Sequence, residues 1–85
     1  MKEYMIEFTI TGDAKSKEFQ DLVPAERAKI GELLVDKVIK GIWLKEDYTG
    51  GYFIASVEDE KALESLFESL PLKPYLSFTS HQLKI

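Results

Sequence analysis

One glutamate stands among apolar residues at helical spacing. Glu26 follows Val23 by three residues and precedes Ile30 by four, so the three side chains share one face of a helix. Burial beside such a stripe disfavours the charged carboxylate and raises its pKa toward the range that suits a general base. Glu26 is therefore the candidate catalytic acid/base. The alternative is a solvated acid in the first helical turn, where the helix dipole favours it.

Two cations, three aromatic side chains and a histidine could complete a small-molecule site around this carboxyl group. Arg27 and Lys40 could bind a substrate carboxylate, or could simply be surface cations near the helix ends. His81 titrates near neutral pH and could contact a ligand, or could lie partly exposed in the last strand. The side chains of Trp43, Tyr52 and Tyr75 each have an apolar body and a polar tip and could form the pocket walls. Alternatively, they could pack in the core or at a dimer interface.

The composition argues against several classes of site and partner. The 85 residues include no cysteine and one histidine, which excludes disulfide bonds and argues against a structural zinc site. The net charge of −4 argues against a nucleic-acid partner, because phosphate binding requires a basic face. No apolar run approaches the ~20 residues of a membrane span, and the N-terminal residues do not resemble a signal peptide. We therefore expect a soluble cytoplasmic protein without a metal.

Six elements in the order β-α-β-β-α-β are expected to position these residues. The expected strands cover 4–11, 41–47, 52–57 and 75–85, and the expected helices cover 59–70 and the stretch from Asp21 or Pro24 to Lys40. Proline is tolerated in the first helical turn, which suggests the start of the first helix. This order predicts one α+β, ferredoxin-like domain over residues 1–85, with a four-stranded antiparallel sheet and both helices on one face.

Glycines are expected to mark two of the boundaries between these elements. Gly41 stands where a glycine commonly follows a helix. Gly50 and Gly51 are expected to adopt positive φ in a hairpin turn between two strands.

The strands carry large apolar residues on both faces, although helices are expected to cover only one. Ile42 and Leu44, for example, alternate with Trp43. A chain of this size buries only ~60–65% of the surface that its unfolded form exposes. A second copy that covers the free face, giving a two-fold homodimer, is the favoured expectation. A bare face of mixed polarity is the alternative.

The stretch SLPLKPY, residues 69–75, places two prolines directly after the second helix. Pro71 is expected to end that helix, because the residue before a proline avoids the α region. Pro74 is expected to hold the chain extended as it enters the last strand, with Leu72 packed inward and Lys73 in solvent. This joint would therefore set where Tyr75 and the last strand enter the sheet.

The same stretch resembles the Leu-Pro-Leu-x-Pro-Tyr signature of the muconolactone isomerase family. The resemblance covers most of the chain. Glu26 and Arg27 stand where the family has a Glu-Lys pair, and Trp43 stands where it has a tryptophan that opens its second strand. The strand at 52–57 and the acidic residue Asp59 also match the family pattern.

The resemblance implies a fold, an assembly and an activity. Family members are ferredoxin-like chains that pair into dimeric α+β barrels and build larger homo-oligomers. They isomerise an unsaturated lactone of aromatic catabolism, without a metal or cofactor. The resemblance thus implies a proton-transfer isomerase, or a related enzyme, acting on a small lactone or carbonyl acid.

One stretch departs from the family pattern. The family carries a basic, histidine-containing segment, Trp-Arg-His-x-Trp-Arg, where this chain reads VIKGIWL. Lys40 keeps a positive charge, but Gly41 stands at the histidine and Leu44 at the second arginine. The alternative function is therefore a non-catalytic homo-oligomer that binds a small ligand or has a purely structural role.

Overall fold

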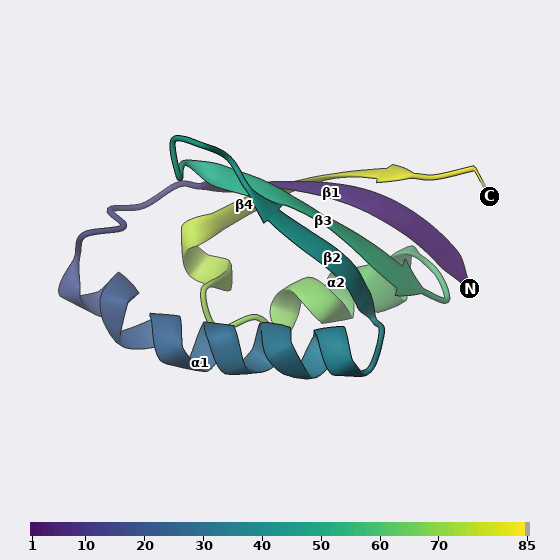
Figure 1. Cartoon of the computed structure of the whole chain (residues 1–85), viewed down its shortest axis with the longest axis horizontal. Coiled ribbons are helices and arrows are strands. Elements are labelled where there is room, and N and C mark those ends of the chain that lie inside the picture. Colours follow the sequence, from purple (N-terminus) through teal and green to yellow (C-terminus); the bar gives the residue numbers. More distant parts are fainter. Residues whose placement is uncertain (85) are drawn as a thin grey trace.

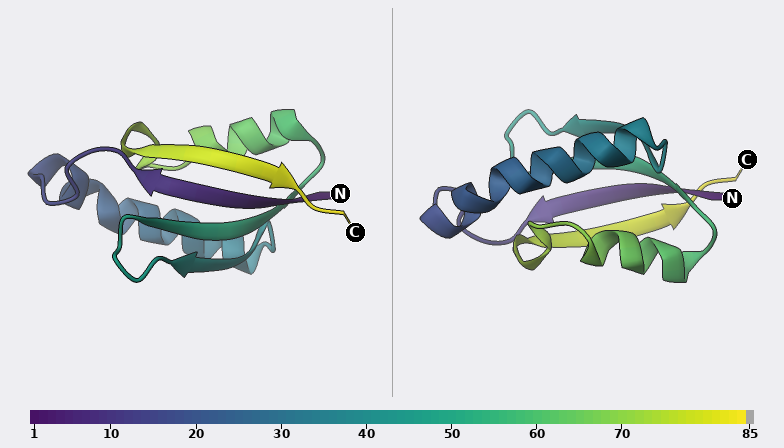
Figure 2. Two further views of the ribbon diagram at one scale, coloured as in Figure 1. Left: turned by 90° about the horizontal axis from the view of Figure 1, so that it is seen from above. Right: turned by 90° about the horizontal axis from the view of Figure 1, so that it is seen from below.

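The computed structural model describes residues 1–84 and confirms the β-α-β-β-α-β order. The elements are β1 (Lys2–Ile10), α1 (Lys17–Val35), β2 (Ile39–Leu44), β3 (Gly50–Val57), α2 (Glu60–Glu68), a 3₁₀ turn (Lys73–Tyr75) and β4 (Leu76–Gln82). The strands form one antiparallel sheet in the order β2-β3-β1-β4. Both helices lie on the same face of this sheet (Figures 1 and 2). The α+β, ferredoxin-like fold is thus confirmed.

The core lies between the helices and the sheet. Strand β1 alternates as expected: Tyr4, Ile6 and Phe8 are buried on the helix side, while Met5 and Glu7 lie on the other side. The buried hydrophobic residues contributed by β2, β3 and α2 are Ile39, Phe53, Ala55, Val57, Leu63 and Leu66. Within residues 1–84, no helix is both long and apolar enough to cross a membrane.

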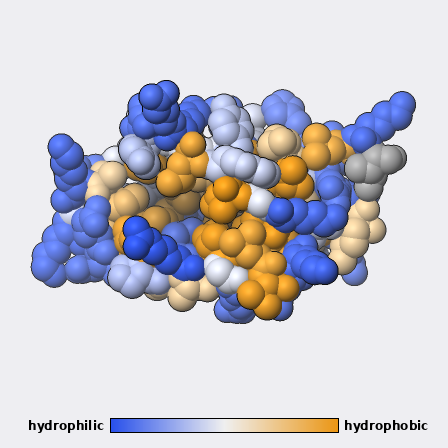
Figure 3. Space-filling model, in the orientation of Figure 1, coloured by the Kyte–Doolittle hydropathy of each residue, from blue (hydrophilic) through white to orange (hydrophobic). Residues whose placement is uncertain are grey.

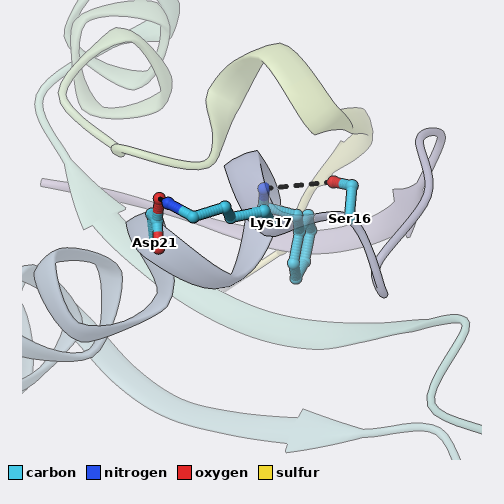
Figure 4. Close-up of polar contacts among 4 residues, drawn as sticks. Ser16, Lys17 and Asp21 are labelled. Carbon is cyan, nitrogen blue, oxygen red and sulfur yellow. Dashed lines mark hydrogen bonds and ion pairs between the residues drawn. The ribbon is translucent and has the colours of Figure 1, made fainter.

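Helix α1 begins earlier than the sequence analysis predicted. Ser16 caps it, since its side-chain oxygen accepts a hydrogen bond of 3.2 Å from the Phe19 N–H (Figure 4). Lys17 and Asp21 add an exposed ion pair of 2.9 Å across the first turn. Pro24 therefore lies inside the helix and does not start it. The buried Phe19 side chain explains the difference, because its packing stabilises turns upstream of the proline.

Helix α1 also ends earlier than predicted, at Val35, and Gly41 is not its cap. Lys37 adopts the left-handed conformation, with φ of 61°. The Lys37 N–H donates to the Leu34 carbonyl at 3.2 Å, and the Val38 N–H donates to the Leu33 carbonyl at 3.0 Å. This is a Schellman ending formed without glycine. It frees the following residues for β2, which starts at Ile39, two residues before the predicted start of this strand at Gly41.

The prediction of positive φ at Gly50 and Gly51 is wrong. Tyr48 takes the left-handed conformation instead, with φ of 59°, and both glycines belong to β3. A Cβ on Gly50 would overlap the Phe8 carbonyl oxygen, and one on Gly51 would overlap the Trp43 carbonyl oxygen. These glycines therefore permit close approach of neighbouring strands.

The proline joint also differs from the expectation. Pro74 does not hold the chain extended, because Lys73–Tyr75 forms a 3₁₀ turn that the fixed φ of proline accommodates. The last strand starts at Leu76, and the expected strand end at Ile85 lies outside the described residues. Leu72 is buried, as predicted.

Candidate active site

A cavity of about 570 Å³ lies between α1 and the helix-facing side of the sheet. This volume falls in the range of small-molecule sites. Hydrophobic side chains gather on this face of the molecule, between α1 and the strands (Figure 3). Apart from Glu26, Arg27 and Gly31, the residues that line the cavity are all hydrophobic: Phe8, Ile10, Phe19, Val23, Ile30, Leu34, Ile42, Leu44, Leu72 and Leu76.

Glu26 is a half-buried carboxyl group in the wall of this cavity. Its Oε1 atom accepts a hydrogen bond of 2.9 Å from the backbone N–H of Leu72. Burial raises the pKa of Glu26 above its ordinary value, and the Leu72 N–H opposes part of that rise. Among residues 1–84, Leu72 is the one hydrogen-bond partner of this side chain. One carboxyl oxygen is thus held in place, while residues 1–84 leave the other without a hydrogen bond.

The proline joint supplies the group that positions Glu26. Helix α2 ends at Glu68, and the chain then turns so that the Leu72 side chain lines the cavity and its N–H reaches α1. Sequence analysis identified Leu72 as a packing anchor but missed its role as a donor. A backbone N–H is present at almost every residue, so the residue type carries no signal for such a bond.

Arg27 also lines the cavity, as the neighbour of Glu26 on α1. Its side chain is exposed and forms no ion pair or hydrogen bond with the other described residues. A guanidinium group that is free at the edge of an apolar cavity is suited to bind an anionic ligand.

Tyr75 supports one end of the cavity. Its hydroxyl donates to Glu18 at 3.1 Å, and its ring packs edge-on against Phe19 with centroids 5.5 Å apart. Phe19 in turn lines the cavity. Tyr75 is not among the lining residues, so it acts on the cavity wall through Phe19.

The other four predicted site residues lie on the opposite face of the sheet. Trp43 pairs with Tyr52 across β2 and β3, and His81 pairs with Met5 across β1 and β4. Lys40 forms an ion pair with Glu3 on this same face. Within one chain, the sheet therefore separates Lys40, Trp43, Tyr52 and His81 from Glu26.

This outer face is mixed in character. Met5, Trp43 and Tyr52 line a shallow hollow of about 440 Å³, and Trp43 is 54% exposed. Lys45 forms an ion pair of 3.0 Å with Glu7 beside it. The dimer that would cover this face remains a prediction.

Sequence analysis missed most of the apolar wall. Gly31, Leu34, Ile42 and Leu44 line the cavity but were not candidates for the site. The alternation along β2 carried a usable signal, because Ile42 and Leu44 face the helix while Trp43 faces away. Among residues 1–84, no group of three or more His, Asp or Glu side chains is arranged to hold a metal ion.

Comparison with known proteins places the chain in a family. The family model of muconolactone delta-isomerase matches residues 2–84. A crystal structure of muconolactone isomerase superposes with a TM-score of 0.84 at 19% identity, over 98% of this chain and 88% of that one. A 5-chloro-2-hydroxyhydroquinone dehydrochlorinase from Burkholderia phenoliruptrix AC1100, in complex with 2,5-dihydroxybenzoquinone, superposes with a TM-score of 0.73 at 18% identity, over 96% and 93% of the two chains.

No curated protein sequence matches the chain significantly. At these identities, the structural similarities establish the fold alone. The family model covers nearly the whole chain. The chain therefore belongs to the muconolactone delta-isomerase family.

Proposed function

We propose that this protein is an isomerase that moves a proton within a small lactone or carbonyl acid, without a cofactor, and that Glu26 is its acid/base. One observation carries the proposal. Glu26 is half-buried in the wall of an apolar cavity, with one oxygen held by Leu72 and a raised pKa. A raised pKa brings a carboxyl group closer to the operating range of a general acid/base.

The proposed reaction needs one carboxyl group and no redox step. The Glu26 carboxylate removes a proton from a carbon next to the carbonyl, or next to a double bond conjugated with it, and the electron pair delocalises onto the carbonyl oxygen. The carboxylic acid so formed returns the proton to a different carbon of the delocalised anion. Substrate and product contain the same atoms, and Glu26 is regenerated as a carboxylate.

The surrounding residues support this chemistry in two ways. Arg27 binds the carboxylate of the substrate and sets its position relative to Glu26. The apolar walls limit access of water, which strengthens the electrostatic contacts inside the cavity.

Binding of a small acid without turnover is a second candidate function. Leu44 lines the cavity at the position where the family pattern has an arginine, and Lys40 pairs with Glu3 on the other face of the sheet. Arg27 is then the one cation among the described lining residues. A site with fewer cations can still bind a small acid, but it stabilises a developing oxyanion less well.

Proton exchange tests the proposed function directly. The purified protein is incubated with muconolactone in deuterated buffer, and NMR follows both deuterium incorporation and isomerisation. We expect incorporation with the wild type and a loss of at least a hundredfold in rate with Glu26→Gln, which is the size typical of removing a general acid/base. Glu32→Gln, an exposed carboxyl on the same helix, is the matched control and should exchange at the wild-type rate.

Two results would contradict the assignment of Glu26. The first is wild-type exchange that survives Glu26→Gln. The second is an equal loss in Glu26→Gln and Glu32→Gln. Saturable binding of the lactone without any exchange would favour the second candidate function.

A further inference from the structure

One glycine in the molecule has no steric reason to be a glycine. A Cβ on Gly12, Gly41, Gly50 or Gly51 would meet a neighbouring side chain or backbone atom within 3 Å, whereas a Cβ on Gly31 would meet nothing within 4 Å. Gly31 nevertheless lies inside α1, where glycine weakens a helix. The empty space beside it is therefore not required by packing within the chain.

That space belongs to the cavity beside Glu26. Gly31 lines the cavity together with Leu34 of α1 and Ile42 and Leu44 of β2. Leu34 and Leu44 are 38% and 61% exposed, so hydrophobic side chains remain partly in water here. A ligand that enters this part of the cavity would remove them from water, which is favourable.

Arg27 determines where the charged group of such a ligand would bind. Arg27 precedes Gly31 by four residues, which is about one helical turn or ~6 Å along the axis. A carboxylate bound at Arg27 would therefore place the remainder of a ligand beside Gly31. The cavity of about 570 Å³ has the volume of roughly twenty water molecules, so a single small ring with a carboxylate fills only part of it.

We infer that the space beside Gly31 receives an apolar substituent of the ligand, and that the ligands of this protein are small organic acids bearing a hydrophobic alkyl or aryl group. The inference rests on the proposed function in taking Arg27 as the anion contact, and it deepens that function by naming the substrate class. Gly31 is then a specificity-determining residue, since it keeps open the part of the cavity that the substituent occupies.

A series of unreactive carboxylates tests this inference on the full chain. Butanoate, hexanoate and octanoate are titrated while NMR follows the backbone amides, and 1-octanol is the uncharged comparison. Each methylene group that enters the cavity should tighten binding by about fourfold. The Gly31→Leu variant should weaken octanoate by at least tenfold and leave butanoate within about twofold of the wild type.

Ala28→Leu is the matched control for Gly31→Leu. Ala28 is exposed on the same helix and does not line the cavity, so its substitution should leave the whole series unchanged. Leucine is a better helix former than glycine, so Gly31→Leu should remain folded, which circular dichroism checks.

Affinities that do not rise with chain length would overturn the inference, as would octanoate binding equally well to Gly31→Leu and wild type. A change of oligomeric state in Gly31→Leu, with no acid bound by the wild type, would also overturn it, since a second copy would then occupy the space. Binding that depends on chain length, without deuterium exchange on muconolactone, would refute the proposed isomerase activity but not the inference about Gly31. Failure of the proposed function and failure of this inference are therefore distinguishable.

Discussion

Replacing Gly31 by alanine should stabilise this protein. Alanine is favoured over glycine in a helix interior by about 1 kcal/mol. Because the added Cβ has no neighbour within 4 Å, no steric penalty opposes this gain. We therefore expect the free energy of unfolding to rise by about 1 kcal/mol, and the melting temperature to rise by ~4–8 °C for a domain of this size.

Urea unfolding followed by circular dichroism measures this change, with thermal melting as a second readout. Gly50→Ala is the control, because its Cβ would overlap the Phe8 carbonyl oxygen, and it should lower the free energy of unfolding. If Gly31→Ala leaves stability unchanged or lowers it, then the space beside Gly31 is filled in solution. The argument that this glycine serves a ligand would then fail.

Two further predictions concern the start of α1 and the site carboxyl group. Ser16→Ala should lower the free energy of unfolding by about 1 kcal/mol, because the Phe19 N–H loses its acceptor. Ser16→Asp should preserve the stability of the wild type. Equal melting temperatures for all three proteins would contradict the role of Ser16 as the helix cap. The raised pKa of Glu26 means that the folded state holds this proton more tightly than the unfolded chain, whose value is 4.5. The resulting stability is present below pH 4.5 and is lost as pH rises through the folded pKa. Wild type should therefore lose stability relative to Glu26→Gln as pH rises above 4.5, and parallel pH profiles would refute the burial of this carboxyl group.

The order of the elements could be predicted from the sequence because local patterns determine it. The alternation of Tyr4, Ile6 and Phe8 indicates a strand buried on one face, and the structure confirms it. The placement of Glu26 on the apolar stripe of a helix was predicted for the same reason, since residues three and four apart share a helical face. The burial of Leu72 was predicted correctly, whereas α2 ends at Glu68, two residues before the predicted end at residue 70.

The boundaries of α1 could not be predicted because local signals gave way to packing. Proline commonly marks the start of a helix, yet burial of Phe19 against Tyr75 extends α1 upstream of Pro24. Gly41 is a stop signal, yet Lys37 takes the left-handed position instead. At Pro24 a contact made elsewhere in the fold outweighs the cost of about 3 kcal/mol of a proline in a helix interior.

The composition of the site was decided by the tertiary structure. The sequence by itself determined that Glu26 and Arg27 are consecutive on one helix, but the packing of α1 against the sheet brings both of them to the cavity. The separation of Trp43, Tyr52 and His81 from Glu26 follows from which face of the sheet the helices cover. The hydrogen bond from Leu72 to Glu26 joins residues 46 positions apart through a backbone group that has no sequence signature. Only the folded chain brings that donor to the carboxylate, because the contact depends on how α1 and the proline joint pack against the same sheet.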